Sequence, residues 1–263
     1  MSVVGLVAGN TIRQIVRQRT FFNVFIFGLG MVIVALVVSN ITFGYRDQVV
    51  RSIGLSGVIL AVDLMALLLS IGLIHAELDR KTLFVVMTRP VTRTAYVLGR
   101  ALGLFAVLSM AMASFGLVVL LTLLSVGGAP TLHDVYALSG GLVEAGILGS
   151  FGLVLSAFTT PMLGTGIGLG FWIAASTTDD LVRLARLKGD NSMGEALHSG
   201  NETMAQALSY VLPNFQVLNF RTEAVYRLTI PGDEFAWALV YGVLWIVGFL
   251  LLAGLILSRR ELV

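Results

Sequence analysis

Residues 21–41, FFNVFIFGLGMVIVALVVSNI, decide the fold class, because this stretch of about 21 residues carries no charged side chain. A helix of that length rises about 30 Å, which is the thickness of the hydrocarbon core of a bilayer. Three arginines precede it, Arg13, Arg17 and Arg19. The stretch is too long for the core of a cleavable signal peptide, and it is typical of a retained membrane anchor.

The rest of the chain has the same character. Of its 263 residues 57% are hydrophobic and 12% are charged, and the mean hydropathy is +0.92. Soluble domains carry roughly 25% charged residues, so much of this protein's outer surface faces lipid. The absence of cysteine excludes thiolate nucleophiles and cysteine-based metal sites, and a net charge of +2 does not indicate a nucleic-acid partner.

Six segments are long enough to cross a bilayer. They are about 21–41, 55–74, 101–126, 135–158, 162–178 and 235–257. Thr159, Thr160 and Pro161 separate the fourth from the fifth, and proline interrupts a helix, so these two form a tight hairpin. We expect an all-α, polytopic membrane protein with six transmembrane helices, and a single transmembrane domain over residues 1–263.

The basic residues predict the orientation. An even number of spans places both termini on one side, together with ten of the seventeen basic residues, in short segments near the membrane. The other seven lie in longer connections. Short basic segments stay in the cytoplasm, so we expect both termini there.

Residues 1–20 predict an amphipathic helix at the cytoplasmic interface. One face is apolar, and the opposite face carries Asn10, Arg13, Gln14 and Arg17. The apolar face consists of Val4, Val7, Ala8, Ile12, Ile15 and Val16. On the other side of the membrane, the connection at 179–234 is mixed in character, and we expect it to form short helices that rest on the membrane surface.

The cytoplasmic loop at 75–100 is the most informative connection. Leu83, Phe84 and Met87 form an apolar stripe between charged residues, and Pro90 ends the short helix that carries it. Such a stripe is suited to a groove on a partner protein. The alternative is that it packs back on the membrane surface.

Several short motifs resemble one family. A glutamate ends the second span, a basic pair and an apolar stretch follow, and then come Arg89-Pro90-x-x-Arg93 and Gly99-Arg100. Leu212-Pro213-Asn214-Phe215 precedes the last span, and Ser258-Arg259-Arg260-Glu261-Leu262 follows it. In this order they resemble the membrane subunits of ABC-2-type transporters, most closely the branch described as permeases for multi-copper enzyme maturation.

The resemblance implies a permease that dimerises with a second copy or a paralogue in the bacterial cytoplasmic membrane, binds two cytoplasmic ATPase subunits, and works as an exporter. It assigns coupling to the ATPase to Glu77, Arg80, Leu83, Phe84, Met87, Arg89, Pro90 and Arg93. The chain should hold no cofactor and no ATP of its own, since neither Lys81 nor Lys188 follows a glycine-rich turn. We therefore do not expect an enzyme.

Two carboxylates inside spans, Asp63 and Glu144, should not face lipid, because a charge at the centre of a span costs about 2.5–3.5 kcal/mol. They line a transport pathway, pair with each other, or make structural hydrogen bonds. Gly164 and Gly168 have the four-residue spacing of a close helix–helix interface. Met110 and Met112 lie on different sides of a helix, and we expect no metal.

Two other classes of protein compete with a transporter. One is a membrane scaffold that transmits force or recruits partners without moving a solute. The other is an intramembrane enzyme, which needs paired acids, a serine–histidine couple or zinc ligands at facing depths, and the spans show no such set. The sequence does not indicate a substrate.

Overall fold

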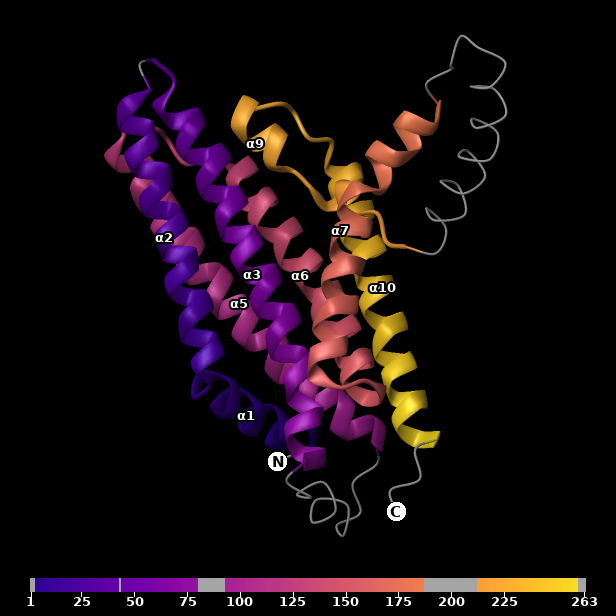
Figure 1. Ribbon diagram of the computed structural model, residues 1–263. Coiled ribbons are helices and arrows are strands. Elements are labelled where there is room, and N and C mark those ends of the chain that lie inside the picture. Colours follow the sequence, from indigo (N-terminus) through magenta and orange to yellow (C-terminus); the bar gives the residue numbers. More distant parts are fainter. Residues whose placement is uncertain (1–2, 43, 80–92, 187–211, 260–263) are drawn as a thin grey trace.

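The computed structural model describes residues 3–42, 44–79, 93–186 and 212–259, and the regular structure in those ranges is entirely helical (Figure 1). The expected all-α fold is thus confirmed for the described residues. In chain order the helices are α1 (Val3–Val16), α2 (Arg19–Ile41), α3 (Arg46–Asp79), α5 (Arg93–Ser125), α6 (Leu132–Phe158), α7 (Pro161–Arg186), the 3-10 turn η1 (Phe215–Leu218), α9 (Arg221–Tyr226) and α10 (Gly232–Arg259).

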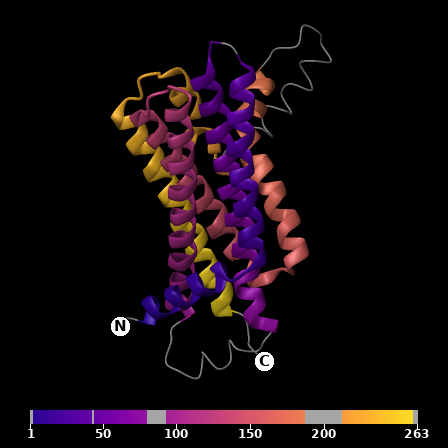
Figure 2. The same cartoon turned by 90° about the vertical axis from the view of Figure 1, so that its left-hand side faces the viewer.

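Five of the described helices are long and apolar enough to cross a membrane, namely α2, α3, α5, α6 and α10. The predicted count of six spans is therefore confirmed for five. Helix α7 begins at Pro161, where a new helix was expected, and Figure 2 shows it along one edge of the bundle. Its glycines and the run Ser176-Thr177-Thr178 dilute its hydrophobic character, so composition alone does not mark it as a span.

Helices α3 and α6 form the core of the bundle, and each is buried over most of its length. Small residues on α6 let the two backbones approach each other: a β-carbon at Gly141 would lie 2.6 Å from Ile59. Near the lower end, the Ser156 hydroxyl donates a hydrogen bond of 2.7 Å to the carbonyl of Ile71. Close contact and a hydrogen bond between helices are what hold transmembrane helices together where the hydrophobic effect gives no preference.

Helices α2 and α10 cover opposite sides of this core, α2 on α3 and α10 on α6 (Figure 1). Both direct large apolar side chains outward, for example Ile26 and Ile33 on α2 and Leu244 and Leu251 on α10. In water such a surface would cause aggregation, but in a bilayer it is the surface that lipid covers.

Helix α3 is much longer than the span predicted at 55–74, because it begins at Arg46 and includes Arg51. The Arg51 side chain is 1% exposed. Its Nε donates to Asp134 Oδ1 at 2.9 Å, Nη1 donates to Asp47 Oδ2 at 3.2 Å, and Nη2 donates to the carbonyl of Ala129. The helix can therefore contain an arginine inside the bundle, because the guanidinium group donates to Asp47 on α3 itself, to Asp134 on α6 and to the loop before α6.

Helix α1 lies across the lower end of the bundle against the first turns of α5 (Figures 1 and 2). The two helices meet at Gly99 and Gly103, where β-carbons would lie 2.7 Å from Val7 and 2.6 Å from Thr11. The expected N-terminal helix is thus present. Its buried face differs slightly from the expected one.

The difference concerns which side of α1 meets α5. Gln14, expected on the polar outward face, accepts a hydrogen bond of 2.6 Å from Arg100 Nη1, while Val16, expected on the apolar face, is 37% exposed. Arg100 itself is 1% exposed, and it also donates to Thr11 Oγ1 and to the hydroxyl of Tyr96. The buried guanidinium requires polar partners, so it turns the polar edge of α1 inward.

Replacing Arg51 with Met should lower the free energy of unfolding by about 3–5 kcal/mol, because it leaves the buried Asp134 carboxylate without its cation. Unfolding of the purified protein in detergent, followed by circular dichroism, measures the loss. The matched control is Arg227→Gln, which removes a half-exposed pair with Asp47 and should cost about 0–1 kcal/mol. Equal losses in the two variants would contradict the assignment of a buried pair.

Candidate functional site

Asp63 on α3 and Glu144 on α6 meet inside the bundle. Their residues are 3% and 4% exposed, and the two carboxyl groups lie close enough to interact directly. As expected, neither faces lipid. Of the arrangements that the sequence leaves open, the structure has the one in which the two acids face each other between the two core helices.

Residues 212–231, the described part of the connection between α7 and α10, pack into the end of the bundle opposite α1 (Figure 1). We call them the external segment, after the side of the membrane that the sequence predicts for them. They contain η1 and α9, and their apolar side chains Phe215, Leu218, Phe220 and Ala224 are buried. The expectation of short helices in this connection is confirmed for that part. They pack against α3, α6, α7 and α10, and their position relative to the membrane surface stays a prediction.

Gly140 on α6 makes this packing possible. A β-carbon there would lie 2.2 Å from the carbonyl oxygen of Leu218, a backbone atom that has no freedom to move aside. Two hydrogen bonds fix the backbone of the external segment around the start of η1. Asn214 Oδ1 accepts from the backbone N–H of Gln216 at the start of η1, and the hydroxyl of Tyr241 on α10 accepts from the N–H of Asn214 at 2.7 Å.

Arg221 brings a positive charge from α9 to the acidic pair. It interacts electrostatically with both Asp63 and Glu144. Its own Nε donates to Asn219 Oδ1 at 2.7 Å, which fixes the start of the side chain. Trp172 on α7 lies beside the two acids with its indole N–H buried. Four elements of the fold therefore contribute one group each to a polar cluster of Asp63, Glu144, Trp172 and Arg221.

This polar cluster is incompletely bonded. Asp63 Oδ1 and Trp172 Nε1 are both buried, and neither has a hydrogen-bond partner of ordinary geometry among the described residues. Unsatisfied groups in a buried polar cluster raise the free energy of the conformation that contains them, which here is the conformation of this structure. Because Arg221 belongs to the external segment, any movement of that segment away from the bundle separates the positive charge of Arg221 from Asp63 and Glu144.

The residues expected to couple the protein to an ATPase fall mostly outside the described part of the chain. Residues 80–92, which include Arg80, Leu83, Phe84, Met87, Arg89 and Pro90, are not described. The backbone of Glu77 belongs to the last turns of α3 and that of Arg93 begins α5, but their side chains are not described either. Their coupling role stays a prediction.

Gly164 and Gly168 on α7 pack within the chain. A β-carbon at Gly164 would lie 3.1 Å from Ile71, and one at Gly168 would lie 2.4 Å from Leu67, both on α3. The alternate pair, Gly166 and Gly170, has no atom within 4 Å of the corresponding positions. The four-residue spacing thus marks a helix–helix interface, and its partner is α3 of the same chain.

The sequence does not identify Arg221, Arg51 or Arg100 as structural residues: Arg221 and Arg51 only contribute to the charge count on the two sides of the membrane, and Arg100 contributes to that count and to the Gly99-Arg100 motif. Arg51 and Arg100 each stand at the edge of an apolar run, a position that also suits a residue at the lipid headgroups. Trp172 gives no signal beyond its place in an apolar segment. Their roles depend on contacts with distant parts of the chain, such as Arg51 with Asp134, 83 positions away, and Arg100 with Gln14, 86 positions away.

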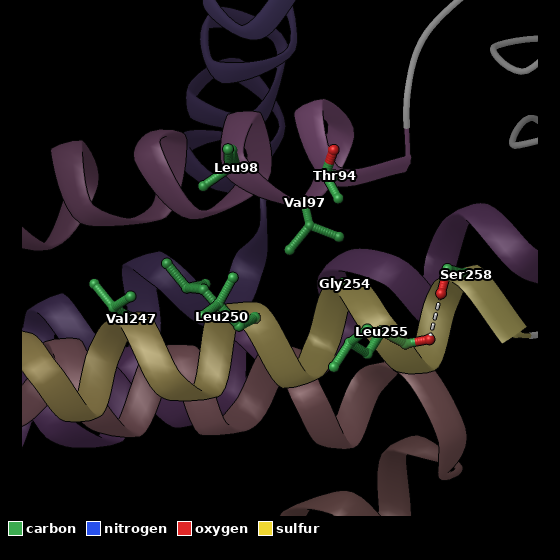
Figure 3. Close-up of a pocket in the computed structure, with 9 residues that line it drawn as sticks. Thr94, Val97, Leu98, Val247, Leu250, Gly254, Leu255 and Ser258 are labelled. Carbon is green, nitrogen blue, oxygen red and sulfur yellow. Dashed lines mark hydrogen bonds between the residues drawn. The ribbon is translucent and has the colours of Figure 1, made fainter.

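An apolar recess separates the start of α5 from the end of α10 (Figure 3). Its wall contains Val97, Leu98, Leu250 and Leu255, and its only hydroxyl groups are those of Thr94 and Ser258. Since none of the described residues that line it is ionisable, its chemistry suits a hydrocarbon chain. Among the described residues no group of three or more histidines and acids is placed to hold a metal ion.

These features define a polytopic helical membrane protein with a polar cluster enclosed midway along its two core helices. A family model described as ABC-2 family transporter protein matches residues 6–262. The chain belongs to this family and is a membrane permease component of an ABC transporter. The family implies, in general, a cytoplasmic ATPase as partner. No curated protein matches the chain, and the match does not confirm the branch of multi-copper enzyme maturation permeases.

Gly140→Ala should displace the external segment, because the new methyl group meets the carbonyl of Leu218. The chain has no cysteine, so Leu218→Cys, at a position that is 1% exposed, provides a reporter. We expect a membrane-impermeant maleimide to label this cysteine several-fold faster when Gly140→Ala is also present. Gly170→Ala, where the methyl group enters open space, is the control, and equal rates in both backgrounds would exclude the close contact.

Arg221→Gln should destabilise the protein by about 1–3 kcal/mol, because two neighbouring buried carboxylates lose their nearby cation. Adding Glu144→Gln should recover most of that loss, since a single acid then remains. A double-mutant cycle on detergent-unfolding midpoints gives the interaction energy. Additive losses would show that Arg221 and Glu144 do not sense each other.

Proposed function

We propose that this permease works as an exporter subunit in the bacterial cytoplasmic membrane, where it pairs with a second permease copy or a paralogue and is driven by two cytoplasmic ATPase subunits. Both of its termini then lie in the cytoplasm. Helix α1, the end of α3, the start of α5 and the end of α10 all lie at one end of the bundle (Figure 1). Arginine-rich segments adjoin each of these ends in the sequence, and such segments favour the cytoplasmic side.

The single observation that carries this proposal is the match of the ABC-2 family transporter model to residues 6–262. A permease of this class needs an external source of work. The sequence supports a partner for that purpose, since the undescribed loop at 80–92 contains the apolar residues Leu83, Phe84 and Met87 between charges. We assign ATPase docking to this loop.

The hydrogen bonds of Arg100 on α5 to α1 connect the docking loop mechanically to the bundle. Arg93 begins α5 directly after the loop, and Arg100, two turns further along, holds Thr11 and Gln14 of α1. A force on the loop therefore moves α5 and α1 together. In this proposal, the amphipathic helix transmits the motion of the ATPase along the cytoplasmic face.

The polar cluster marks the transport pathway in this proposal. It places two acidic side chains between the core helices, and Arg221 on the external segment covers them from outside. Opening outward lifts residues 212–231 and exposes Asp63 and Glu144 to the pathway. A scaffold that moves no solute has no use for such a cluster, which favours transport over that alternative.

For the second copy, we assign the outward face of α7. Gly166 and Gly170 leave open space there, and Met162, Ile167 and Ile173 are exposed beside them. Small residues with apolar neighbours are the surface on which transmembrane helices associate closely. Since Gly164 and Gly168 are occupied by α3, the second permease contacts the alternate pair.

Phe84→Asp together with Met87→Asp should abolish association with the ATPase, because charged groups cannot enter an apolar groove at acceptable cost. Co-purification of the ATPase with the tagged permease from membranes measures this. The control, Thr222→Asp with Thr229→Asp, adds the same charge at two exposed positions on the outer side, and there ATPase recovery should be unchanged. Full recovery with the Phe84/Met87 variant would overturn the docking role.

Transport itself is tested in liposomes that contain the permease and its ATPase. ATP-dependent movement of a solute that is lost in an ATPase without hydrolytic activity supports the exporter. Stable ATP hydrolysis with no solute moved, whatever compound is offered, supports the force-transmitting scaffold.

A further inference from the structure

A second recess, which unlike the first has a polar wall, lies on the outer side of the bundle, between the external segment and the start of α10. Its volume is about 580 Å³, and it is separate from the cluster of Asp63 and Glu144, none of whose members lines it. Its polar and aromatic wall consists of Gln216, Asn219, Glu223, Glu234, Trp237 and Tyr241. Neither the ABC-2 match nor the proposed transport cycle gives this recess a role.

The recess is acidic. Glu223 and Glu234 both line it, and none of the described residues that line it is basic. Glu223 Oε2 is buried, and it has no hydrogen-bond partner among the described residues. A buried carboxylate oxygen without a donor is costly, and a cation held in the recess beside the Glu223 carboxylate offsets part of that cost. The position of Glu234 in the first turn of α10 is favourable for the helix dipole, but no such effect accounts for the buried oxygen of Glu223.

The amide side chains of the wall are already used within the protein. Asn219 Nδ2 donates to Gln216 Oε1 at 3.2 Å, and Asn219 Oδ1 accepts from Arg221 Nε. Gln216 Nε2 in turn donates to the carbonyl of Ser176. The oxygens of both amides are thus already bonded within the protein, and what the wall offers a cation is the negative charge of its two glutamates.

Aromatic rings determine which kind of cation fits. Trp237 is 72% exposed at the rim, and the ring of Tyr241 is held in place by the bond of its hydroxyl to the N–H of Asn214. Rings beside carboxylates bind ammonium groups through their π faces. A divalent metal ion needs more oxygen ligands at short distance than two carboxylates supply, and the volume is much larger than one ion requires.

We propose that this recess binds an organic ammonium group, with Glu223 and Glu234 as its counter-charges and Trp237 and Tyr241 as its aromatic wall. Trp and Tyr are typical of the depth of lipid headgroups, so two sources present the same chemistry: the headgroup of an amino-phospholipid and a free organic amine. The inference is independent of the proposed transport cycle, because it concerns binding to the permease alone.

The test uses Trp237 as a fluorescent reporter. The chain has three tryptophans, and Trp172→Phe with Trp245→Phe leaves Trp237 alone. The full-length protein is placed in nanodiscs of phosphatidylglycerol and titrated with choline chloride, with sodium chloride at equal ionic strength as the reference. We expect a saturable fluorescence change with choline and none with sodium, and the half-saturating concentration should rise about tenfold in Glu223→Gln and in Glu234→Gln.

Asp233→Asn is the matched control, since Asp233 precedes Glu234 on the same exposed helix start and does not line the recess; its titration should equal that of the parent. Equilibrium dialysis with radiolabelled choline repeats the comparison without fluorescence, and thermal unfolding confirms that each variant is folded.

A second arm replaces part of the phosphatidylglycerol with phosphatidylethanolamine. A fluorescence change without choline, and a weaker response to added choline, identifies the lipid headgroup as the ligand. An unchanged choline titration identifies a free amine. The proposal is overturned by a folded parent that shows no saturable response in either arm, or by an equal response in Glu223→Gln, Glu234→Gln and Asp233→Asn.

Discussion

The cost of an unpaired charge in a hydrocarbon environment organises this molecule. In the described part of the chain, five arginine, aspartate and glutamate side chains are buried in the helical bundle, and each of them meets a partner from a distant part of the chain: Arg51 meets Asp134, Arg100 meets Gln14, and Asp63 meets Glu144. Apolar contacts alone do not fix the register of helices in lipid, because lipid is as good a neighbour as leucine. The buried polar groups define that register, and the small residues of α6 and α7 then permit the close approach that it requires.

The three polar contacts act at different levels of the bundle. Arg51 and Asp134 join α3 to α6 at the outer end, where Asp47 also reaches Arg227 at the end of α9. Arg100 joins α5 to α1 at the opposite end. Between these levels, the acidic pair has incompletely satisfied bonds. The two ends are thus firmly connected, and the weakest polar arrangement lies between the core helices, where a transport protein has to change shape.

Much of the fold is predictable from sequence because length and hydrophobicity report directly on lipid. The five confirmed spans, the break at Thr159-Thr160-Pro161 and the N-terminal helix all follow from local patterns. The long outer extension of α3 does not, because Arg51 is compatible with the helix only through Asp134, more than eighty positions away. The burial of the external segment depends on one missing side chain, at Gly140, and among twenty-nine glycines nothing in the sequence distinguishes this one. Asp63 and Glu144 were recognisable as unusual, whereas Arg221 and Trp172, which complete their surroundings, were not.

The connection between α6 and α7 has a geometric consequence. Only Thr159 and Thr160 separate the two helices, Pro161 starts the second one, and the N–H of Gly164 bonds to the carbonyl of Thr160 at 2.8 Å. The ends of α6 and α7 that this turn joins therefore cannot separate. Any rotation of α7 away from α6 has its pivot at this turn. A small change in the angle between the two helices then moves α7 by a distance that increases along the helix and is greatest at its far end.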